Sequence, residues 1–169
     1  MLIGAARRLK AGQAIGIDVW LPKALTGNSP MAVLENAALE GVAERVQVTA
    51  GDARKLPFPD GSIDVVVSNF VLHEMQTGAE REQMVREIAR VLKTGGRVAL
   101  VDFIFTEQCV GELINCGLAN AGRARMKRFW STAITSFGMV RLYKVIGTKV
   151  AARSETTVAT EATTKPLNG

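Results

Sequence analysis

The 169-residue sequence predicts an α/β fold in which a sheet carries helices on both faces. Strand-like and helix-like segments alternate along the chain. The apolar run IDVVVSNFVL, residues 63–72, is typical of a central parallel strand covered on both sides. Two further strand-like segments, residues 14–19 and 45–52, carry an aspartate at their carboxyl ends. Open α/β sheets bind ligands at that edge, so these aspartates are candidate site residues.

Local signals mark the first elements. Residues 1–10 predict a helix, and residues 14–19 predict the first strand. A second helix begins with Ser29 as N-cap and Pro30 at the first helical position, and Gly41 ends it. The predicted buried face of this helix consists of Val33, Leu34, Ala37 and Ala38.

The later elements follow from periodicity and turn residues. They are a strand at 45–52, a strand at 63–72 with Val65 to Val67 in the core, a helix at 79–92 ended by Gly95 and Gly96, a strand at 97–103, a helix at 107–121, and one or two antiparallel strands within 139–151. Residues 153–169 are small and polar and predict a disordered tail, so the domain is expected to occupy residues 1–152.

The composition excludes several classes of protein. No apolar run is long enough to span a bilayer, and the N-terminus lacks the features of a signal peptide, so a cytoplasmic protein is expected. Cys109 and Cys116 match no zinc-binding spacing and are expected to be partly buried, reduced thiols. With a single histidine and no clustered ligands, no metal site is predicted.

Basic residues gather in the segment 122–149, where the chain has seven Lys or Arg and no Asp or Glu. A solvated surface explains this run, and contact with an anionic membrane surface or with nucleic acid is the alternative. No nucleic-acid-binding module accompanies the run, so a nucleic-acid partner is not predicted. The apolar residues of this region suit packing on the sheet, or a lipophilic acceptor or membrane: Phe129, Trp130, Ile134 and Phe137.

Three segments in register resemble class I S-adenosylmethionine-dependent methyltransferases. They are GIDVW (16–20), GDARKLPFPDGSIDVVVSNFVLHEM (51–75) and EIARVLKTGGRVALVDF (87–103). The chain is most similar to the small-molecule branch that includes ubiquinone/menaquinone-biosynthesis enzymes, over residues 1–103. The resemblance implies a Rossmann-like sheet, S-adenosylmethionine as cofactor, and methyl transfer to a small-molecule acceptor. It says nothing of the oligomeric state.

The resemblance also implies roles for the residues that end the first strand. Asp18 is placed where its two carboxylate oxygens accept both ribose hydroxyls. Val19 and Trp20 are placed to cover the adenosine, for which an indole offers a broad flat surface. The plainer alternatives are a helix cap or a solvated turn for Asp18, and a core or interface aromatic for Trp20.

Further cofactor contacts are implied at the next two strand ends. Asp52 matches the family's acidic residue that accepts from the adenine amino group, and the amide of Ala53 meets a ring nitrogen. Asn69 matches a position lining the methionine part. Asp52 and Asn69 alternatively serve as simple caps. Asp64 begins its strand at the opposite edge of the sheet and is expected to be structural.

His73 is the candidate for a catalytic role, because it follows the central strand where substrate approaches. The alternative is a histidine that only bonds a backbone carbonyl. Methyl transfer needs little acid–base help, because the sulfonium is already activated and in-line positioning supplies most of the catalysis. No dedicated catalytic residue is therefore expected beyond this candidate.

The family pattern opens with a strand and a glycine-rich loop of the form LDxGxGxG, and this sequence has neither. Met1 falls within the segment equivalent to the following helix, with Gly4 inside that helix and Gly12 at its end. A truncated or wrongly started chain is the hypothesis this suggests. The strands ending at Asp18 and Asn69 are then expected to keep unpaired edges or to pair with each other. Weak cofactor binding is also expected, and micromolar affinity by calorimetry would refute it.

Two other functions remain open from the sequence. A nicotinamide-dependent oxidoreductase shares the aspartate after the second strand, but Tyr143 and Lys144 are adjacent and form no Tyr-x-x-x-Lys pair. The second is an inactive methyltransferase-like fragment or binding module, which the missing loop favours.

Overall fold

The computed structural model describes residues 1–21, 28–126 and 142–151. Its strands form two separate hydrogen-bonded sheets, called here the first and the second part. In the first part, β1 (Ala14–Asp18) pairs in parallel with β2 (Val46–Ala50). The second part has four strands in the order β3 (Ile63–Asn69), β4 (Leu92–Asp102), β6 (Tyr143–Lys149) and β5 (Leu118–Arg125). Strands β3 and β4 are parallel, and β6 runs antiparallel to both of its neighbours.

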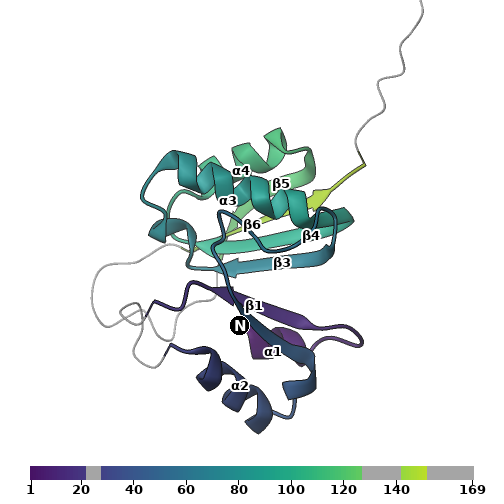
Figure 1. Ribbon diagram of the computed structural model, residues 1–169. Helices are drawn as coiled ribbons and strands as arrows, with labels where there is room; N and C mark the ends of the chain where they lie inside the picture. Colours follow the sequence, from purple (N-terminus) through teal and green to yellow (C-terminus); the bar gives the residue numbers. More distant parts are fainter. Residues whose placement is uncertain (22–27, 127–141, 152–169) are drawn as a thin grey trace, which may run out of the picture.

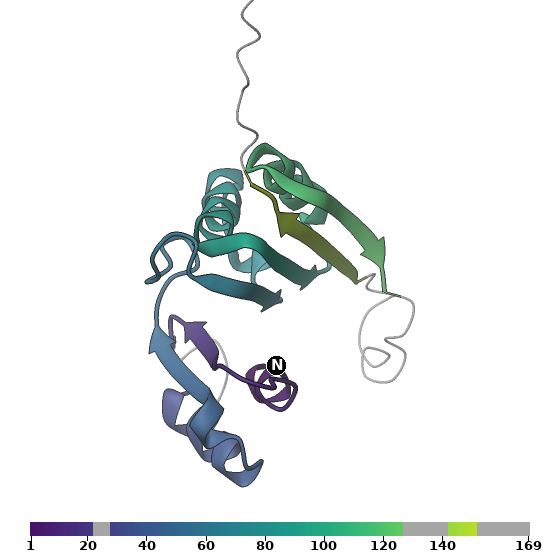
Figure 2. The same cartoon turned by 90° about the vertical axis from the view of Figure 1, so that its right-hand side faces the viewer.

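Helices lie on opposite sides of the strands. They are α1 (Leu2–Ala6), α2 (Pro30–Leu39), α3 (Gly78–Val91) and α4 (Thr106–Asn115), with short 3-10 turns η1 (Ala43–Arg45) and η2 (Leu72–Glu74). Figures 1 and 2 show α3 and α4 on one side and α1 and α2 on the other. The predicted α/β fold with helices on both faces is therefore confirmed. None of the helices in the described ranges is long and apolar enough to cross a membrane.

Each part of the sheet has its own core. The larger core joins α3 and α4 to the second part of the sheet and includes Ile88, Leu100, Leu113 and Val145. The smaller core joins α1 and α2 to β1 and β2, and small side chains such as Ala6, Ala14 and Ala37 dominate it. Helices α1 and α2 thus cover only β1 and β2, and α3 and α4 cover only the four-stranded part.

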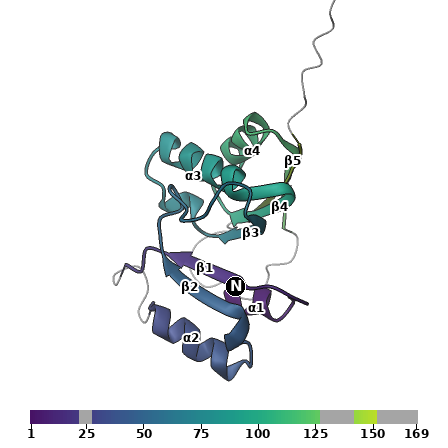
Figure 3. The ribbon, with the colours of Figure 1, turned by 45° about the vertical axis from the view of Figure 1, so that its right-hand side comes forward.

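Strands β1 and β3 face each other across the division of the sheet. They run side by side in the same direction (Figures 1 and 3), but within the described ranges no backbone ladder joins them. The expectation that the strands ending at Asp18 and Asn69 keep unpaired edges is met.

This division corrects the prediction that Val65 to Val67 are core residues. Val66 packs against the larger core, whereas Val65 is 50% and Val67 45% exposed. Alternate residues of a strand point to opposite faces, and α3 and α4 cover only the face to which Val66 points.

Local signals placed both ends of α2 correctly, but the first predicted helix was too long, because α1 ends at Ala6. Gly95 and Gly96, predicted to end α3, lie within β4, which follows α3 directly. The Ser29 hydroxyl accepts a hydrogen bond from the amide of Ala32, and the Thr77 side chain forms a capping box with Glu80. The predicted buried face of α2 was wrong in part, because Ala37 is buried but Leu34 and Ala38 are exposed. This helix contacts only a narrow two-stranded layer.

The predicted helix at 107–121 was too long. Helix α4 ends at Asn115, and Gly117 follows with φ of +78°, a conformation that ends helices. Residues 118–125 then form β5 instead of helix. The apolar residues Phe129 to Phe137 and the tail 153–169 lie outside the described residues.

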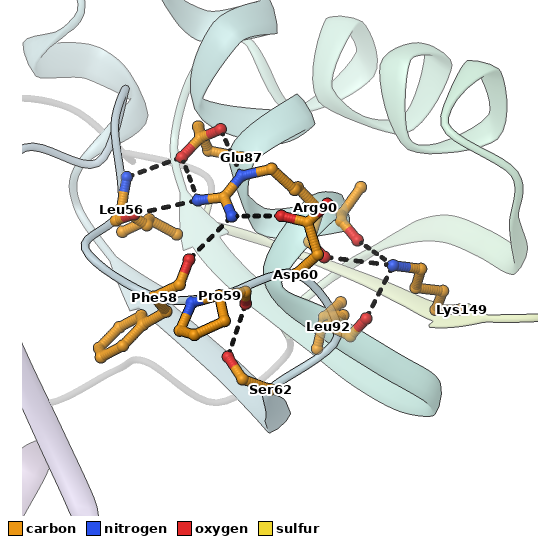
Figure 4. Close-up of polar contacts among 10 residues, drawn as sticks. Leu56, Phe58, Pro59, Asp60, Ser62, Glu87, Arg90, Leu92 and Lys149 are labelled. Atoms are coloured by element: carbon orange, nitrogen blue, oxygen red, sulfur yellow. Dashed lines mark hydrogen bonds and ion pairs between the residues drawn. The ribbon is translucent and has the colours of Figure 1, made fainter.

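The loop between β2 and β3 is held against the end of α3 by Arg90 (Figure 4). The Arg90 guanidinium pairs with Glu87 and Asp60 and donates to the carbonyls of Leu56 and Phe58. The carboxylate of Glu87 in turn accepts from the amide of Leu56. These contacts hold residues 56–60, which follow Asp52 in the same loop, against α3.

Lys149 at the end of β6 closes the same helix terminus (Figure 4). Its Nζ donates to the carbonyls of Ala89 at 2.7 Å, Leu92 at 2.8 Å and Arg90 at 3.3 Å. A cation at a helix C-terminus satisfies carbonyls that lack intrahelical partners and complements the helix dipole. One residue of the basic segment therefore has a structural role.

Candidate functional site

Asp18 and Asp52 lie at the same edge of the sheet. Asp18 is the last residue of β1 and stands opposite Ala50, the last residue of β2. The amide of Gly51 donates to the carbonyl of Asp18 at 3.0 Å, which places Asp52 one residue beyond this contact. The two carboxylates therefore follow adjacent carboxyl ends, as ligand groups do in open α/β sheets.

The backbone bends sharply after Asp18. Its Oδ1 accepts from the amide of Trp20 at 2.8 Å, and Trp20 adopts the left-handed conformation with φ of +51°. Val19 between them is exposed. The indole Nε1 of Trp20 is buried, and within the described residues no acceptor lies near it. Asp18 thus caps its own turn with one oxygen, while Oδ2 has no bond to any described group.

Asp52 is engaged by Arg54. The Arg54 amide donates to Oδ1 at 2.8 Å, its Nε lies 3.0 Å from each carboxylate oxygen, and its Nη2 lies 2.6 Å from Oδ2. Hydrogen bonds from Arg54 lower the pKa of Asp52 below its ordinary value, against a smaller opposing effect of burial. Arg54 also pairs with Glu80 of α3. These four contacts come from three N–H donors, because the single Nε–H is shared between the two oxygens. A carboxylate has about four acceptor positions, so Asp52 keeps capacity for one further donor.

The edge continues across the division to β3. Asn69, the last residue of β3, is exposed and stands opposite Val101 of β4. Ala53, three residues beyond the end of β2, is half-buried and packs against the larger core. Asp64 lies at the opposite end of β3, where its exposed side chain pairs with Lys93 at 2.9 Å.

His73 in η2 faces the carboxylate of Asp102, the last residue of β4. Its Nδ1 lies 3.2 Å from Oδ2, and its backbone amide donates to the same oxygen at 3.3 Å. Oδ1 of Asp102 accepts from the amide of Phe103 at 2.7 Å. The Asp102 side chain is fully buried. The His73 ring therefore contacts the buried carboxylate of Asp102, whereas the alternative considered from the sequence was a bond to a backbone carbonyl.

Three aromatic residues at this edge share a strained backbone. Trp20, Phe70 and Phe105 follow β1, β3 and β4, and all have φ between +51° and +58°. Bulky side chains rarely adopt this conformation, at a cost of about 1–3 kcal/mol each. Such strain concentrates at binding sites, and here it marks the edge that also holds the four polar residues Asp18, Asp52, Asn69 and Asp102.

Sequence reasoning did not single out Arg54, Phe70 or Asp102. Asp102 carried the same signal as Asp18, since it ends a strand-like apolar segment, VALVD at residues 98–102. Its contact with His73, 29 residues earlier, has no signal in the sequence. Arg54 is two residues from Asp52, and that spacing alone does not distinguish a pair from two solvated charges.

The basic segment is only partly described. Arg123 pairs with Glu107 and lies over the ring of Tyr143, and Lys149 closes α3. Residues 127–141 lie outside the described ranges, so membrane contact stays a prediction. Among the residues that the structure describes, no group of three or more His, Cys, Asp or Glu is placed to hold a metal ion.

Comparison with known proteins finds methyltransferases among the curated relatives. The family described as a methyltransferase domain matches residues 5–100, more than half of the chain. A 27-O-demethylrifamycin SV methyltransferase of Amycolatopsis mediterranei is 43% identical over 70 residues, 41% of this chain and 25% of the relative. The ubiquinone/menaquinone biosynthesis C-methyltransferase UbiE of Ectopseudomonas mendocina is 44% identical over 64 residues, 38% of this chain and 24% of the relative. The chain spans about a quarter of the length of these curated relatives.

Solved structures share the fold. Geranyl diphosphate C-methyltransferase of Streptomyces coelicolor, solved with Mg²⁺, geranyl diphosphate and S-adenosyl-L-homocysteine, superposes with a TM-score of 0.64. The two are 12% identical, and the match covers 88% of this chain and 66% of that one. The oxidoreductase and binding-module alternatives gain no support from these comparisons. The chain belongs to the methyltransferase domain family and has the fold of the class I S-adenosylmethionine-dependent enzymes.

Proposed function

We propose that this chain binds S-adenosylmethionine at the carboxyl edge of β1, β2 and β3 and transfers its methyl group to a small molecule. The observation that carries the proposal is the placement of Asp18 and Asp52 at the ends of two paired parallel strands. Relatives named as methyltransferases of rifamycin and quinone biosynthesis support a small-molecule acceptor. A fold neighbour solved with S-adenosyl-L-homocysteine supports the cofactor.

The described residues fit the nucleoside. Asp18 uses Oδ1 for the Trp20 amide, so Oδ2 is available to accept from the ribose hydroxyls. The exposed Val19 and the half-buried Trp20 provide apolar surface for the adenosine. The buried Nε1 of Trp20 is a donor whose partner is not found among the described residues, as expected beside a ligand with acceptor atoms.

The remaining contacts follow the same edge. Asp52 accepts from the adenine amino group with the capacity that Arg54 leaves, and the amide of Ala53 donates to a ring nitrogen. Asn69 lines the methionine part from the end of β3. The bound cofactor supplies a methyl group already activated on a sulfonium. The residues of the chain hold this methyl in line with the acceptor and exclude water.

Isothermal titration of the full chain with S-adenosylmethionine, S-adenosylhomocysteine and NAD⁺ tests the cofactor. We expect both sulfur ligands to bind, with affinity weaker than micromolar, and NAD⁺ not to bind. Asp18→Asn removes the charge from the ribose-binding group and is expected to weaken binding at least about tenfold. The matched control is Asp64→Asn at the opposite end of β3, which is expected to leave the affinity unchanged. Binding that Asp18→Asn leaves intact, or no binding of either ligand at millimolar concentration, contradicts the proposal.

The acceptor requires a separate test. Incubation with S-adenosylmethionine carrying a labelled methyl group, together with a panel of phenols, quinols and aliphatic alcohols, should label an organic-soluble product. Mass spectrometry of that product distinguishes methylation at oxygen from methylation at carbon. Label recovered only in the protein or in water argues against a small-molecule acceptor.

A further inference from the structure

The four-stranded part of the sheet carries an apolar face on which no helix of the described ranges packs. Helices α3 and α4 cover the side to which Leu100 and Val145 point. Alternate residues of the same strands point to the other side. Among these, Val65, Val67 and Ile146 are 50%, 45% and 46% exposed. We call this side the open face.

The strand register places the residues of the open face side by side. Its middle row crosses β3, β4, β6 and β5 as Val67, Ala99, Ile146 and Gly122. Ala99 is smaller than the residues on either side of it, and a Cβ added at Gly122 meets no described atom within 4 Å. The face is therefore raised along β3 and β6 and low along β4, a relief that accepts a row of side chains from one helix.

Two cations border this apolar surface. Arg97 stands opposite Val65 of β3, Lys144 stands opposite Val101 of β4, and both cationic side chains are exposed. None of the paired positions on the open face carries Asp or Glu. Arg97 and Val101 are four residues apart on one strand, so the two cations are separated by about 13 Å along the strand direction.

These charges argue against two possible occupants. In a twofold dimer the same surface contributes from both copies, so two faces that carry only cations would meet and repel each other. Binding to an anionic membrane surface relies on clusters of about four to eight Lys or Arg. The open face has only Arg97 and Lys144 among its paired positions.

We propose that the open face binds an acidic amphipathic helix of a partner protein. The apolar side of that helix lies along β4 between Val67 and Ile146, and acidic residues near its two ends pair with Arg97 and Lys144. A helix rises about 1.5 Å per residue, so acidic residues about nine positions apart match the separation of the two cations. The apolar face of a sheet is ordinarily buried against helices. Helices α1 and α2 lie on this side of the molecule (Figures 1 and 2) and cover β1 and β2, and the partner helix extends their layer.

The inference goes beyond the proposed function and does not depend on the cofactor. Methyl NMR of the full chain tests it first without a partner. A soluble paramagnetic reagent is expected to broaden the methyl signals of Val65, Val67 and Ile146 much more than those of the buried Val145. Shielding of all three residues in the free chain would mean that other residues of the chain cover the face, and it would overturn the inference.

Two synthetic helical peptides of about 14 residues then stand in for the partner. One has leucine along one side and glutamate on the other, and the second has lysine in place of each glutamate. We expect the acidic peptide to shift the methyl signals of Val67 and Ile146 and to bind at least about tenfold more tightly than the basic peptide.

Lys144→Glu and its control Arg125→Glu make the same change of charge on opposite faces of the sheet. Arg125 is exposed and follows Ala124, the residue opposite Lys144, so it points to the other face. We expect Lys144→Glu to weaken binding of the acidic peptide at least about fivefold and to strengthen binding of the basic one. Arg97→Glu should act in the same way, and Arg125→Glu should change neither affinity. Thermal unfolding checks that all three variants are folded.

Several results would overturn the inference. They are equal binding of the two peptides, no binding of the acidic peptide at millimolar concentration, and equal effects of Lys144→Glu and Arg125→Glu. A dimer in sedimentation whose contact shields Ile146 would assign the face to a second copy. Vesicles of phosphatidylserine and phosphatidylcholine that shift the Val67 and Ile146 signals, where the acidic peptide does not, would assign it to a membrane.

Discussion

Arg54 holds the carboxylate of Asp52 with three nitrogens: its backbone amide donates to Oδ1 at 2.8 Å, its Nε lies 3.0 Å from both oxygens, and its Nη2 lies 2.6 Å from Oδ2. The same guanidinium reaches Glu80 on α3. The carboxylate proposed to meet the adenine is thereby tied to the helix that covers the larger core. The contact lowers the pKa of Asp52, and backbone and Arg54 hydrogen bonds together lower that of Glu80.

Arg54→Met should make the unfolding free energy less dependent on pH in the acidic range. The folded pKa of Asp52 lies below its unfolded value near 4, so the ion pair contributes stability that is complete above pH 4 and is lost as pH falls through the folded value. We expect the variant to be less stable than wild type at pH 7 and the difference to shrink toward pH 3. Urea unfolding at a series of pH values measures this. Arg97→Met, which changes an exposed arginine, is the control, and a difference independent of pH would contradict the prediction.

Arg90→Met should free the loop after β2. The variant loses bonds to the carbonyls of Leu56 and Phe58 and leaves Glu87 without its main partner. Hydrogen bonds from charged groups contribute about 1.5–3 kcal/mol each, so we expect a loss of about 2 kcal/mol of unfolding free energy and faster amide exchange over residues 56–62.

The control for Arg90 is Arg86→Met on the same helix. Arg86 is exposed and pairs with side chains only, Glu112 and Glu82, and such surface pairs contribute at most about 1 kcal/mol. Equal losses in the two variants would show that the backbone carbonyls of the loop do not matter. Chemical unfolding and hydrogen exchange together decide between the outcomes.

Local chemistry accounts for what the sequence predicted well. The Ser29 cap and Gly41, which follows α2 with φ of +67°, act within one turn of chain, so their signals are readable without a structure. The exposure of Val65 and Val67 depends on which strands and helices lie beside β3, and no property of the run itself encodes that. The contact of His73 with Asp102 likewise depends on the parallel pairing of β3 and β4.

The two cysteines should differ strongly in reactivity. Burial, with a further effect from Asp102, raises the pKa of Cys109 to about 12, and burial also raises that of the half-buried Cys116. The thiolate is the reactive form, so Cys109 should be almost inert at pH 8 while the native chain persists. A disulfide reagent should titrate one thiol quickly, and both in denaturant. Cys116→Ser should abolish the fast phase of the reaction. A fast phase that persists in this variant would come from Cys109 and would contradict the prediction.

Substitution by alanine should have opposite effects on stability at Gly111, within α4, and at Gly117, just after it. Gly111 lies within α4, and a Cβ added there meets nothing within 4 Å, so Gly111→Ala should raise the unfolding free energy by up to about 1 kcal/mol through helix propensity. Gly117 follows the end of α4 with φ of +78°, a backbone conformation that strains any residue with a Cβ even where, as here, there is space for it. Gly117→Ala should therefore lower the unfolding free energy by about 1 kcal/mol. Thermal and urea unfolding of both variants measure the difference. Changes of the same sign would mean that the chain after α4 does not hold the backbone that Gly117 adopts, and β5 would then not begin at Leu118.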